Sequence, residues 1–583
     1  MRLIDTGLAA LRDNASYDVV VVGAGGAGLS AALYAAIDGA RVLLVEHSEF
    51  VGGTTAWSAG TTWIPGTRHA ASVNPRDTLL EAKRYLDNAV GDRTPAALRQ
   101  AFLDNGSRAV DRIEANSEVK YRAYPRHPDY ISDLKGSTVN GRALEPLPFD
   151  GRLLGDLFQL IRPPIPEFTV LGGMMVDRTD INHLLALSKS FASFRHAVKL
   201  LARHAGDRLR HPRGTRLVTG NALVGRLLYS LSLRNNVTLA MNTSVEQIQQ
   251  GAGGVESVAL LSSSDKGQRR TVQVKGGVIL ASGGFNRHPR LRQEMLPGID
   301  TAWCPGAPGH TGQAHELARQ LGGHYGSGGL SPAFWAPVST RRREDGSQAV
   351  FPHFMMDRAK PDMITVNRAG ERFVNESTSY HLFGLKMQEV NQTTPTIPAY
   401  LVCDAEALRR YGLGMVRPGG KGLAPYLADG YLTQADSLQE LAKKLGIDAA
   451  GLQTSVQKLN AYADTGVDPD FQRGVTAYQQ NMGDASRGGR NPNIGPLNQA
   501  PYYAVRLYPG DIGAATGFAC TADACVLGQD EQPIGGLYAV GNDMHSIMGG
   551  AYPGPGITIG PGLVFAYLAA RHAAARALAA GKA

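Results

Sequence analysis

Residues 17–46, YDVVVVGAGGAGLSAALYAAIDGARVLLVE, contain the pattern that determines the predicted fold of this chain. An apolar, β-branched run at 17–22 is followed by a glycine-rich turn, an alanine-rich run at 30–39 and a second apolar run at 42–45. This order predicts a strand, a tight turn, a helix and a second strand, which together form a βαβ unit.

Gly23, Gly25 and Gly28 have the G-x-G-x-x-G spacing of a dinucleotide-binding turn. In such a turn the first glycine allows the sharp bend, the second lets the backbone approach a pyrophosphate, and the third lets helix pack closely on strand. The helix N-terminus offers N–H groups to phosphate. Glu46, 18 residues after Gly28, would accept hydrogen bonds from ribose hydroxyls and disfavours a 2′-phosphate. We therefore predict a dinucleotide site, with a ligand-free βαβ unit as the alternative.

The composition is that of a globular enzyme with more than one core. The chain has 583 residues, with 43% hydrophobic and 19% charged residues. Its four cysteines form no C-x-x-C pair, so we expect no metal site, no disulfide framework and a reducing, cytoplasmic location. We see no secretory signal and no apolar run long enough to span a membrane.

The positive charge is concentrated in one segment. The chain carries a net charge of +8, and residues 189–216 contain eight basic residues and one acid, so this segment alone contributes +7. Apolar residues recur there at steps of three and four: Leu184, Leu187, Phe191, Phe194, Val198 and Leu201. This spacing predicts one helix with an apolar stripe, and Lys189, Arg195, Lys199 and Arg203 lie on the adjoining arc.

A basic amphipathic helix suits two different environments. It can lie in a membrane interface, which would make 184–216 a peripheral contact with the inner face of the cell membrane. Alternatively, the stripe packs on the protein's own core while the cations are solvated. No groove-reading motif accompanies the charge, so we do not expect nucleic acid as a partner.

Later segments extend the nucleotide-binding sheet. Short strands are predicted at 278–281, within KGGVILASGGF, and at 536–542, GLYAVGN, followed by a helix at 556–571. Residues 1–300 and 490–583 therefore build one domain, which carries the basic insertion at about 181–216. Residues 301–489, with a helical stretch at 437–464, form a second domain inserted into the first.

Three further segments resemble one superfamily of flavoproteins. They are GGTTAWS at 52–58, PDMITVNRAGERFVNE at 361–376, and GGAYPGPGITIGP at 549–561 with the nearby Asn542. The chain resembles the fumarate reductase/succinate dehydrogenase superfamily and, within it, the FAD-dependent 3-ketosteroid dehydrogenases. The resemblance runs from about Tyr17 to the end. It implies an α/β fold, in which a Rossmann-like FAD-binding domain carries an inserted α+β catalytic domain for the substrate.

The resemblance also implies non-covalent FAD. Thr54, Thr55, Ala56 and Trp57 stand where some relatives carry a histidine linked to the flavin. No second G-x-G-x-x-G follows a strand, so we expect electrons to leave to an external acceptor, a quinone or a dye. The motifs assign these residues to FAD: Gly23, Gly25, Gly26, Ala27, Gly28, Glu46, Gly53, Thr54, Thr55, Ser58, Val245, Ala281, Gly541, Asn542, Gly556 and Ile557.

The same resemblance implies 1,2-dehydrogenation of 3-ketosteroids and a role for each catalytic residue. Tyr380 takes a proton from C2 with assistance from Tyr130, and a hydride passes from C1 to flavin N5. The O–H of Tyr552 and the N–H of Gly556 polarise the C3 carbonyl, because two aimed donors stabilise developing enolate charge. A free tyrosine has a pKa of about 10, so Tyr380 would need help from its surroundings.

Two positions depart from the pattern, and three other functions stay open. His127 stands before Pro-Asp-Tyr130 where relatives often have a second tyrosine, and Gln313 replaces an acid. His127 would either titrate near neutral pH or lie at the surface. The alternative functions are a 4(5)-desaturating ketosteroid dehydrogenase, a fumarate-reductase-like ene reductase, and a non-catalytic flavin-containing carrier at a membrane surface. A reductase of dicarboxylates would need clustered arginines to bind both carboxylates of its substrate. A carrier that only binds its ligand would not need the proton acceptor that the tyrosines supply.

Overall fold

The main sheet carries the predicted βαβ unit at its centre. The computed structural model describes residues 8, 11–187, 190–264, 267–354 and 357–581. The sheet has eight strands, and β1 lies between β11 and β2 with all three parallel. The parallel strands are β1 (Ala15–Val22), β2 (Val42–Val45), β8 (Val237–Ala240), β11 (Arg269–Leu280) and β19 (Pro533–Ala539). Antiparallel pairs add β9 (Thr243–Gly251), β10 (Gly254–Ser262) and β18 (Cys525–Leu527). The fold class predicted from the sequence is confirmed.

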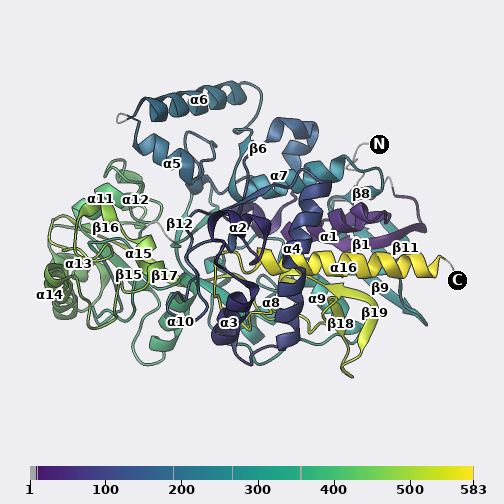
Figure 1. Ribbon diagram of the computed structural model, residues 1–583. Coiled ribbons are helices and arrows are strands. Elements are labelled where there is room, and N and C mark those ends of the chain that lie inside the picture. The colour runs from purple at the N-terminus through teal and green to yellow at the C-terminus, as the bar shows by residue number, and fades with distance from the viewer. Residues whose placement is uncertain (1–7, 9–10, 188–189, 265–266, 355–356, 582–583) are drawn as a thin grey trace.

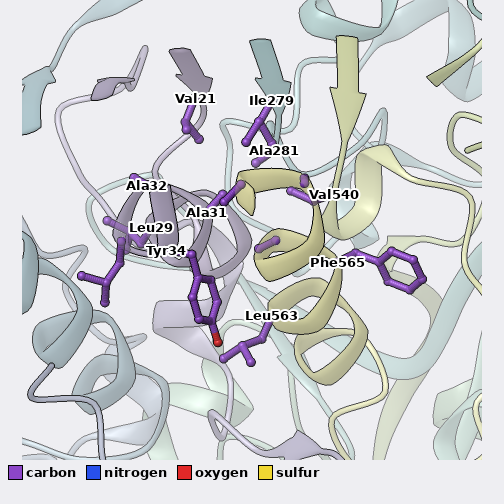
Figure 2. Packing of buried hydrophobic residues seen from close by; sticks show 14 of the residues in the cluster. Val21, Leu29, Ala31, Ala32, Tyr34, Ile279, Ala281, Val540, Leu563 and Phe565 are labelled. Atoms are coloured by element: carbon purple, nitrogen blue, oxygen red, sulfur yellow. The ribbon is translucent and has the colours of Figure 1, made fainter. Parts of the chain in front are cut away.

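Two helices from opposite ends of the chain pack together on this sheet. They are α1 (Gly26–Ile37) and α16 (Ile559–Ala580), which Figure 2 shows side by side below the strand ends. Ala31 and Ala32 of α1 are fully buried. Their small side chains allow neighbouring elements to pack close to this helix. The hydroxyl of Tyr34 donates to the carbonyl of Ala109 at 2.8 Å, which ties α1 to α4 (Ala96–Asn116). These contacts fix α1 against both α16 and α4.

The second domain is built on a six-stranded antiparallel sheet. Its strands are β12 (Ala333–Arg342), β13 (Gln348–Pro352), β14 (Met363–Val366), β15 (Ala399–Cys403), β16 (Thr433–Ala435) and β17 (Tyr502–Ala514). Alternate residues of β15 enter different cores: Leu401 lies in one, and Tyr400 and Val402 in the other. The sheet is thus buried on both faces. Its last strand, β17, follows residue 489, where the second domain was expected to end.

Helices cover both faces of the second sheet (Figure 1). They are α10 (Tyr380–Val390), α11 (Ala405–Tyr411), α12 (Ala424–Ala428), α13 (Leu438–Leu445) and α14 (Ala449–Thr465). The short helix α15 (Ala477–Met482) instead contributes Tyr478 and Met482 to the main core. The helical stretch predicted at 437–464 consists of two helices. Gly446 ends α13 in the left-handed region at φ 71°, and the side chain of Asp448 caps α14 by accepting from Gly451 N.

The basic segment forms a helical hairpin on the first domain. The single helix predicted across 184–201 is wrong, because α5 (Arg178–Leu185) ends and α6 (Phe191–Arg208) begins within it. A capping box between Asp177 and Asp180 starts α5, which sets its N-terminus six residues before the expected one. Figure 1 shows α6 as an outlying helix at the top of the view. Lys189 lies outside the described residues.

The remaining elements lie outside the two large sheets. The helices are α2 (Arg68–Val73), α3 (Leu79–Val90), α7 (Thr219–Ser232), α8 (Pro289–Met295) and α9 (Gln313–Gln320). The short strands are β3 (Thr62–Trp63), β4 (Tyr121–Ala123), β5 (Ala143–Pro146), β6 (Phe149–Asp150) and β7 (Arg216–Leu217). Within the described residues, none of the helices has the length and apolar character required to cross a bilayer.

Candidate active site

A large cavity lies where the two domains meet, and both contribute to its wall. The first domain supplies the glycine turn and the start of α1, and the second supplies Phe334, Pro352, Phe354, Tyr380 and Ile512. This position beyond the carboxyl ends of parallel strands is where α/β sheets bind nucleotides.

The three glycines of the turn have different surroundings. A Cβ added at Gly23, which has φ +103°, would stand 2.4 Å from the carbonyl oxygen of Ala281. One added at Gly28 would stand 1.8 Å from the carbonyl oxygen of Gly23. By contrast, a Cβ added at Gly25 would meet nothing within 4 Å, and Gly25 lines the cavity. Gly23 and Gly28 therefore serve packing, whereas Gly25 leaves room for a ligand.

The Gly25→Ala variant is expected to fold normally and to bind FAD on the order of tenfold more weakly, because its methyl group would occupy the ligand's space. The Gly28→Ala variant should instead lose about 1–3 kcal/mol of stability through overpacking. The flavin-to-protein absorbance ratio and thermal unfolding of the FAD-free protein measure the two effects separately. Equal FAD content in wild type and Gly25→Ala would contradict this role of Gly25.

Glu46 is fixed at one end of the cavity. Its carboxylate accepts from Ala24 N at 2.8 Å and from Ser48 N and Oγ at 3.0 and 2.7 Å. Burial opposes ionisation, but His47 and these hydrogen bonds hold the pKa of Glu46 below its usual range. Arg162 lies at the same end, where it donates to Ser48 Oγ at 3.3 Å. An ionised, oriented acid at this position suits ribose hydroxyls.

The other residues predicted to hold the cofactor lie along the same cavity. All but two of the predicted set line it; the exceptions are Gly28, beneath the turn, and Ile557, which is 1% exposed and lines a separate small pocket. The cavity thus offers a helix N-terminus for a pyrophosphate, an acid for a ribose and small residues for a flat ring. These residues fit FAD.

A buried polar network supports the cavity floor and has no signature in the sequence. Asp543 accepts from Ser282 N at 2.5 Å, from Gly284 N at 2.8 Å and from His315 Nε2 at 3.1 Å. Burial opposes ionisation, yet His315 and the Ser282 donors hold the pKa of Asp543 below its usual range. Asp543 thereby joins the loop after β11, the end of β19 and α9. Only the fold brings these partners together, so the sequence pattern could not identify them.

Three tyrosines far apart in the sequence meet at the other end of the cavity. The hydroxyls of Tyr130 and Tyr380 lie 3.2 Å apart. The ring of Tyr552 lies 5.1 Å from that of Tyr380 and 5.7 Å from that of Tyr130, centroid to centroid. Tyr478, which was not predicted, packs 4.8 Å from the Tyr130 ring but does not line the cavity.

Burial controls the protonation of this cluster. It raises the pKa of Tyr380 and Tyr130 well above 10, and the neighbouring tyrosines raise both pKa values further. Burial also raises the pKa of Tyr552. All three are therefore neutral at pH 7, so that Tyr552 has a proton to donate and a tyrosine base would need to lose one.

The turn at 549–561 is built around Gly556. Its φ is +87°, and an added Cβ would stand 2.1 Å from the carbonyl oxygen of Thr61. The Gly556 carbonyl accepts from Trp63 N at 3.2 Å, while its own N–H has no acceptor in the described part of the chain. Gly556 and Tyr552 both line the cavity, so this N–H and the phenol both belong to its wall. The Tyr130 N–H donates to the carbonyl of Pro553 at 2.8 Å, which fixes Tyr130 to this turn.

His127 and Gln313, the two residues that depart from the family pattern, also line the cavity. Burial, with a contribution from Arg178, lowers the pKa of His127 to about 4. His127 is therefore neutral at pH 7, and the expectation that it titrates near neutrality is not met. Its ring lies 6.4 Å from that of Tyr130. Gln313 donates to the carbonyl of Val245 at 3.2 Å, which links α9 to β9.

Comparison with known proteins gives a consistent result over nearly the whole chain. Residues 18–559 match the model of the FAD binding domain family. The chain is 37% identical to a 4-oxocyclohex-2-ene-1-carboxylate 5-dehydrogenase of Sinomonas cyclohexanicum, over 96% of this chain and 93% of that protein. It is 34% identical to a 3-oxosteroid 1-dehydrogenase of Mycolicibacterium smegmatis, over 97% and 98% respectively.

One solved structure is similar to this protein over nearly the whole length of both chains. It is a 3-ketosteroid delta1-dehydrogenase from Sterolibacterium denitrificans in complex with 1,4-androstadiene-3,17-dione. The TM-score is 0.89 at 33% identity, and the match covers 96% of this chain and 99% of that one. The similarity therefore includes both domains.

Proposed function

The chain belongs to the FAD binding domain family and is an FAD-dependent oxidoreductase, and we propose that it dehydrogenates neutral 3-ketosteroids between C1 and C2. The observation that carries this proposal is the meeting of Tyr130, Tyr380 and Tyr552 at one end of the cavity, beside the turn that contains Gly556. The Gly556 N–H, which has no acceptor among the described residues, belongs to the same turn as Tyr552, and both residues line the cavity. Together they supply a proton acceptor with a relay partner and two donors for one carbonyl.

The proposed reaction divides between two bonds of the steroid A ring. Tyr552 O–H and Gly556 N–H donate to the C3 carbonyl oxygen, which acidifies the neighbouring C2–H. Tyr380 accepts the C2 proton, and Tyr130, 3.2 Å away, hydrogen-bonds to its hydroxyl. FAD, when bound, supplies the acceptor for the hydride that leaves C1. Loss of one proton and one hydride forms the C1–C2 double bond.

The charges in the cavity favour a neutral substrate over a keto acid. Among the described residues that line it, the carboxylate and guanidinium side chains are those of Glu46 and Arg162, and both hydrogen-bond to Ser48. Beside the tyrosines the wall contains Phe334, 5.1 Å from Tyr552, and Phe354, 4.8 Å from Tyr380, measured between ring centroids. The cavity wall also includes apolar Ile165, Phe168, Pro352 and Ile512. A carboxylate there would lose its hydration without gaining a cation. The same argument disfavours fumarate and other dicarboxylates.

This argument predicts a preference that can be measured. Androst-4-ene-3,17-dione is expected to bleach the bound flavin with at least about 100-fold higher kcat/KM than 4-oxocyclohexanecarboxylate, because the acid pays desolvation and buries less apolar surface. Anaerobic stopped-flow absorbance is the measurement. The methyl ester of the acid, neutral and of similar size, is the control and should react faster than the acid. A faster reaction with the acid than with the steroid would overturn the proposed substrate class.

A separate oxidant is needed for turnover. We propose a quinone or an artificial dye in this role, because one dinucleotide turn is present and FAD occupies it in the proposed assignment. Reoxidation of the reduced enzyme by a quinone but not by NAD would support this choice.

A further inference from the structure

The outward face of α6 is apolar. Phe191 is 78% exposed, Phe194 50%, Val198 46% and Leu201 37%. The face that packs on the protein is instead made of small, polar and few apolar residues: Ser193, Ala197, Leu200, His204 and Asp207. An ordinary surface helix has the reverse arrangement, with its large apolar residues buried.

Polar contacts hold α6 in this orientation. His204 Nε2 lies 2.9 Å from the carbonyl oxygen of Leu171, and Asp207 accepts from Thr215 N at 2.8 Å. His196 Nε2 lies 2.8 Å from Asp180 Oδ1 on α5. Because these contacts fix the polar side of α6 against the protein, the large apolar side chains on the opposite side must face either solvent or a binding partner.

Unpaired cations flank the apolar face. Arg195, Lys199 and Arg208 are exposed, and none forms an ion pair with a described carboxylate. Arg203 and Arg216 of the same segment differ, since they pair with Asp150 and Asp180 at 2.8 and 2.7 Å. An apolar row bordered by free cations is complementary to anionic headgroups above an acyl layer.

We propose that α6 docks this protein on the surface of an anionic lipid bilayer, with Phe191, Phe194, Val198 and Leu201 at the boundary between headgroups and acyl chains. Figure 1 shows α6 at the edge of the molecule, and the exposure of these four side chains leaves the face accessible. Leu209, which is 86% exposed and follows α6, would extend the contact.

The docking face is close in the structure to the wall of the active-site cavity. Phe168 lines the cavity and is 39% exposed, and the same loop carries Leu171, which is 63% exposed and is held to α6 through His204. If the substrate is a neutral steroid, as the proposed function states, this arrangement brings the cavity near the phase in which steroids dissolve. That consequence rests on the proposed function, whereas lipid docking does not.

Vesicle flotation of the FAD-loaded protein tests the proposal. We compare vesicles of phosphatidylcholine alone with an equal mixture of phosphatidylcholine and phosphatidylglycerol. Wild type should float with the mixed vesicles at low salt and less so at high salt. The Arg195→Gln/Lys199→Gln variant should bind about 30-fold more weakly, as expected for two charges near an anionic surface. The Phe191→Ser/Phe194→Ser/Val198→Ser variant should stay with the unbound protein.

Matched controls separate docking from damage. Val467 and Val475, which are 62% and 63% exposed in the second domain, provide a serine double variant that should float like wild type. Circular dichroism, flavin content and turnover with a soluble dye should be unchanged in every variant, so failure to dock is distinguishable from failure of the proposed function. Equal flotation of wild type and the triple variant would overturn the proposal. So would a wild-type dimer that the triple variant converts to monomer, because the face would then bind a second copy.

Discussion

The Tyr552→Phe variant is expected to lose about 300-fold in kcat/KM for androst-4-ene-3,17-dione, a typical cost of removing one donor from an oxyanion site. Phenylalanine preserves the ring that contacts Tyr380, Tyr130 and Phe334, so packing is retained. What is lost is the proton that burial keeps on the phenol by raising its pKa. Steady-state kinetics with a dye acceptor measure the loss, and the flavin spectrum checks that FAD remains bound.

Tyr478→Phe is the matched control for this variant. Tyr478 is buried and packs against Tyr130, but it does not line the cavity. Its replacement should change kcat/KM by no more than about threefold, because phenylalanine keeps the ring that packs on Tyr130 and the lost hydroxyl does not line the cavity. Similar losses in both variants would mean that the cluster acts through packing, and the role assigned to Tyr552 would be wrong.

The Tyr380→Phe variant is expected to lose about 1000-fold in kcat, within the range typical of a general base. Because the base must be unprotonated and burial raises the pKa of Tyr380 well above 10, only a small fraction is reactive at pH 7. Below that pKa the reactive fraction grows about tenfold per pH unit. Wild-type kcat/KM should therefore rise from pH 7 to pH 9, and the variant should lose this slope.

Two measurements distinguish a base from a residue that only shapes the site. Exchange of the C2 hydrogen of a bound ketosteroid with deuterated water should stop in Tyr380→Phe and continue in wild type. Tyr130→Phe keeps the base and removes only its hydrogen-bond partner, so its loss should be smaller, about tenfold. Retention of both exchange and pH slope in Tyr380→Phe would assign the proton transfer to another group.

The parts of the structure that were predictable from the sequence have local signals. The glycine spacing and the apolar runs predicted β1, α1 and β2, because each element's pattern depends only on its own residues. The three tyrosines were predicted from the resemblance to a known family, because local spacing cannot predict contacts between residues that are hundreds of positions apart. The fold brings Tyr130, Tyr380 and Tyr552 into contact.

The features that the sequence did not predict correctly have physical causes. The stripe at 184–201 has helical spacing throughout, but α5 ends at Leu185 and α6 begins at Phe191, and the spacing of the apolar residues does not register this break. The contacts of Asp543 with Ser282 and His315 depend on strand order, which no single segment encodes. Likewise, the low pKa of His127 arises from its burial and from the charge of Arg178, 51 residues further along the chain.

Identification of the product from 5α-androstane-3,17-dione tests the central claim most directly. This steroid is saturated on both sides of the C3 carbonyl, so one substrate reports the position of dehydrogenation. The arrangement of Tyr380, Tyr552 and Gly556 predicts 5α-androst-1-ene-3,17-dione as the first product, detected by mass spectrometry and NMR with a dye as the acceptor. Androst-4-ene-3,17-dione as the first product would identify a 4(5)-dehydrogenase, and the absence of any oxidised steroid from FAD-loaded enzyme would contradict the proposed function.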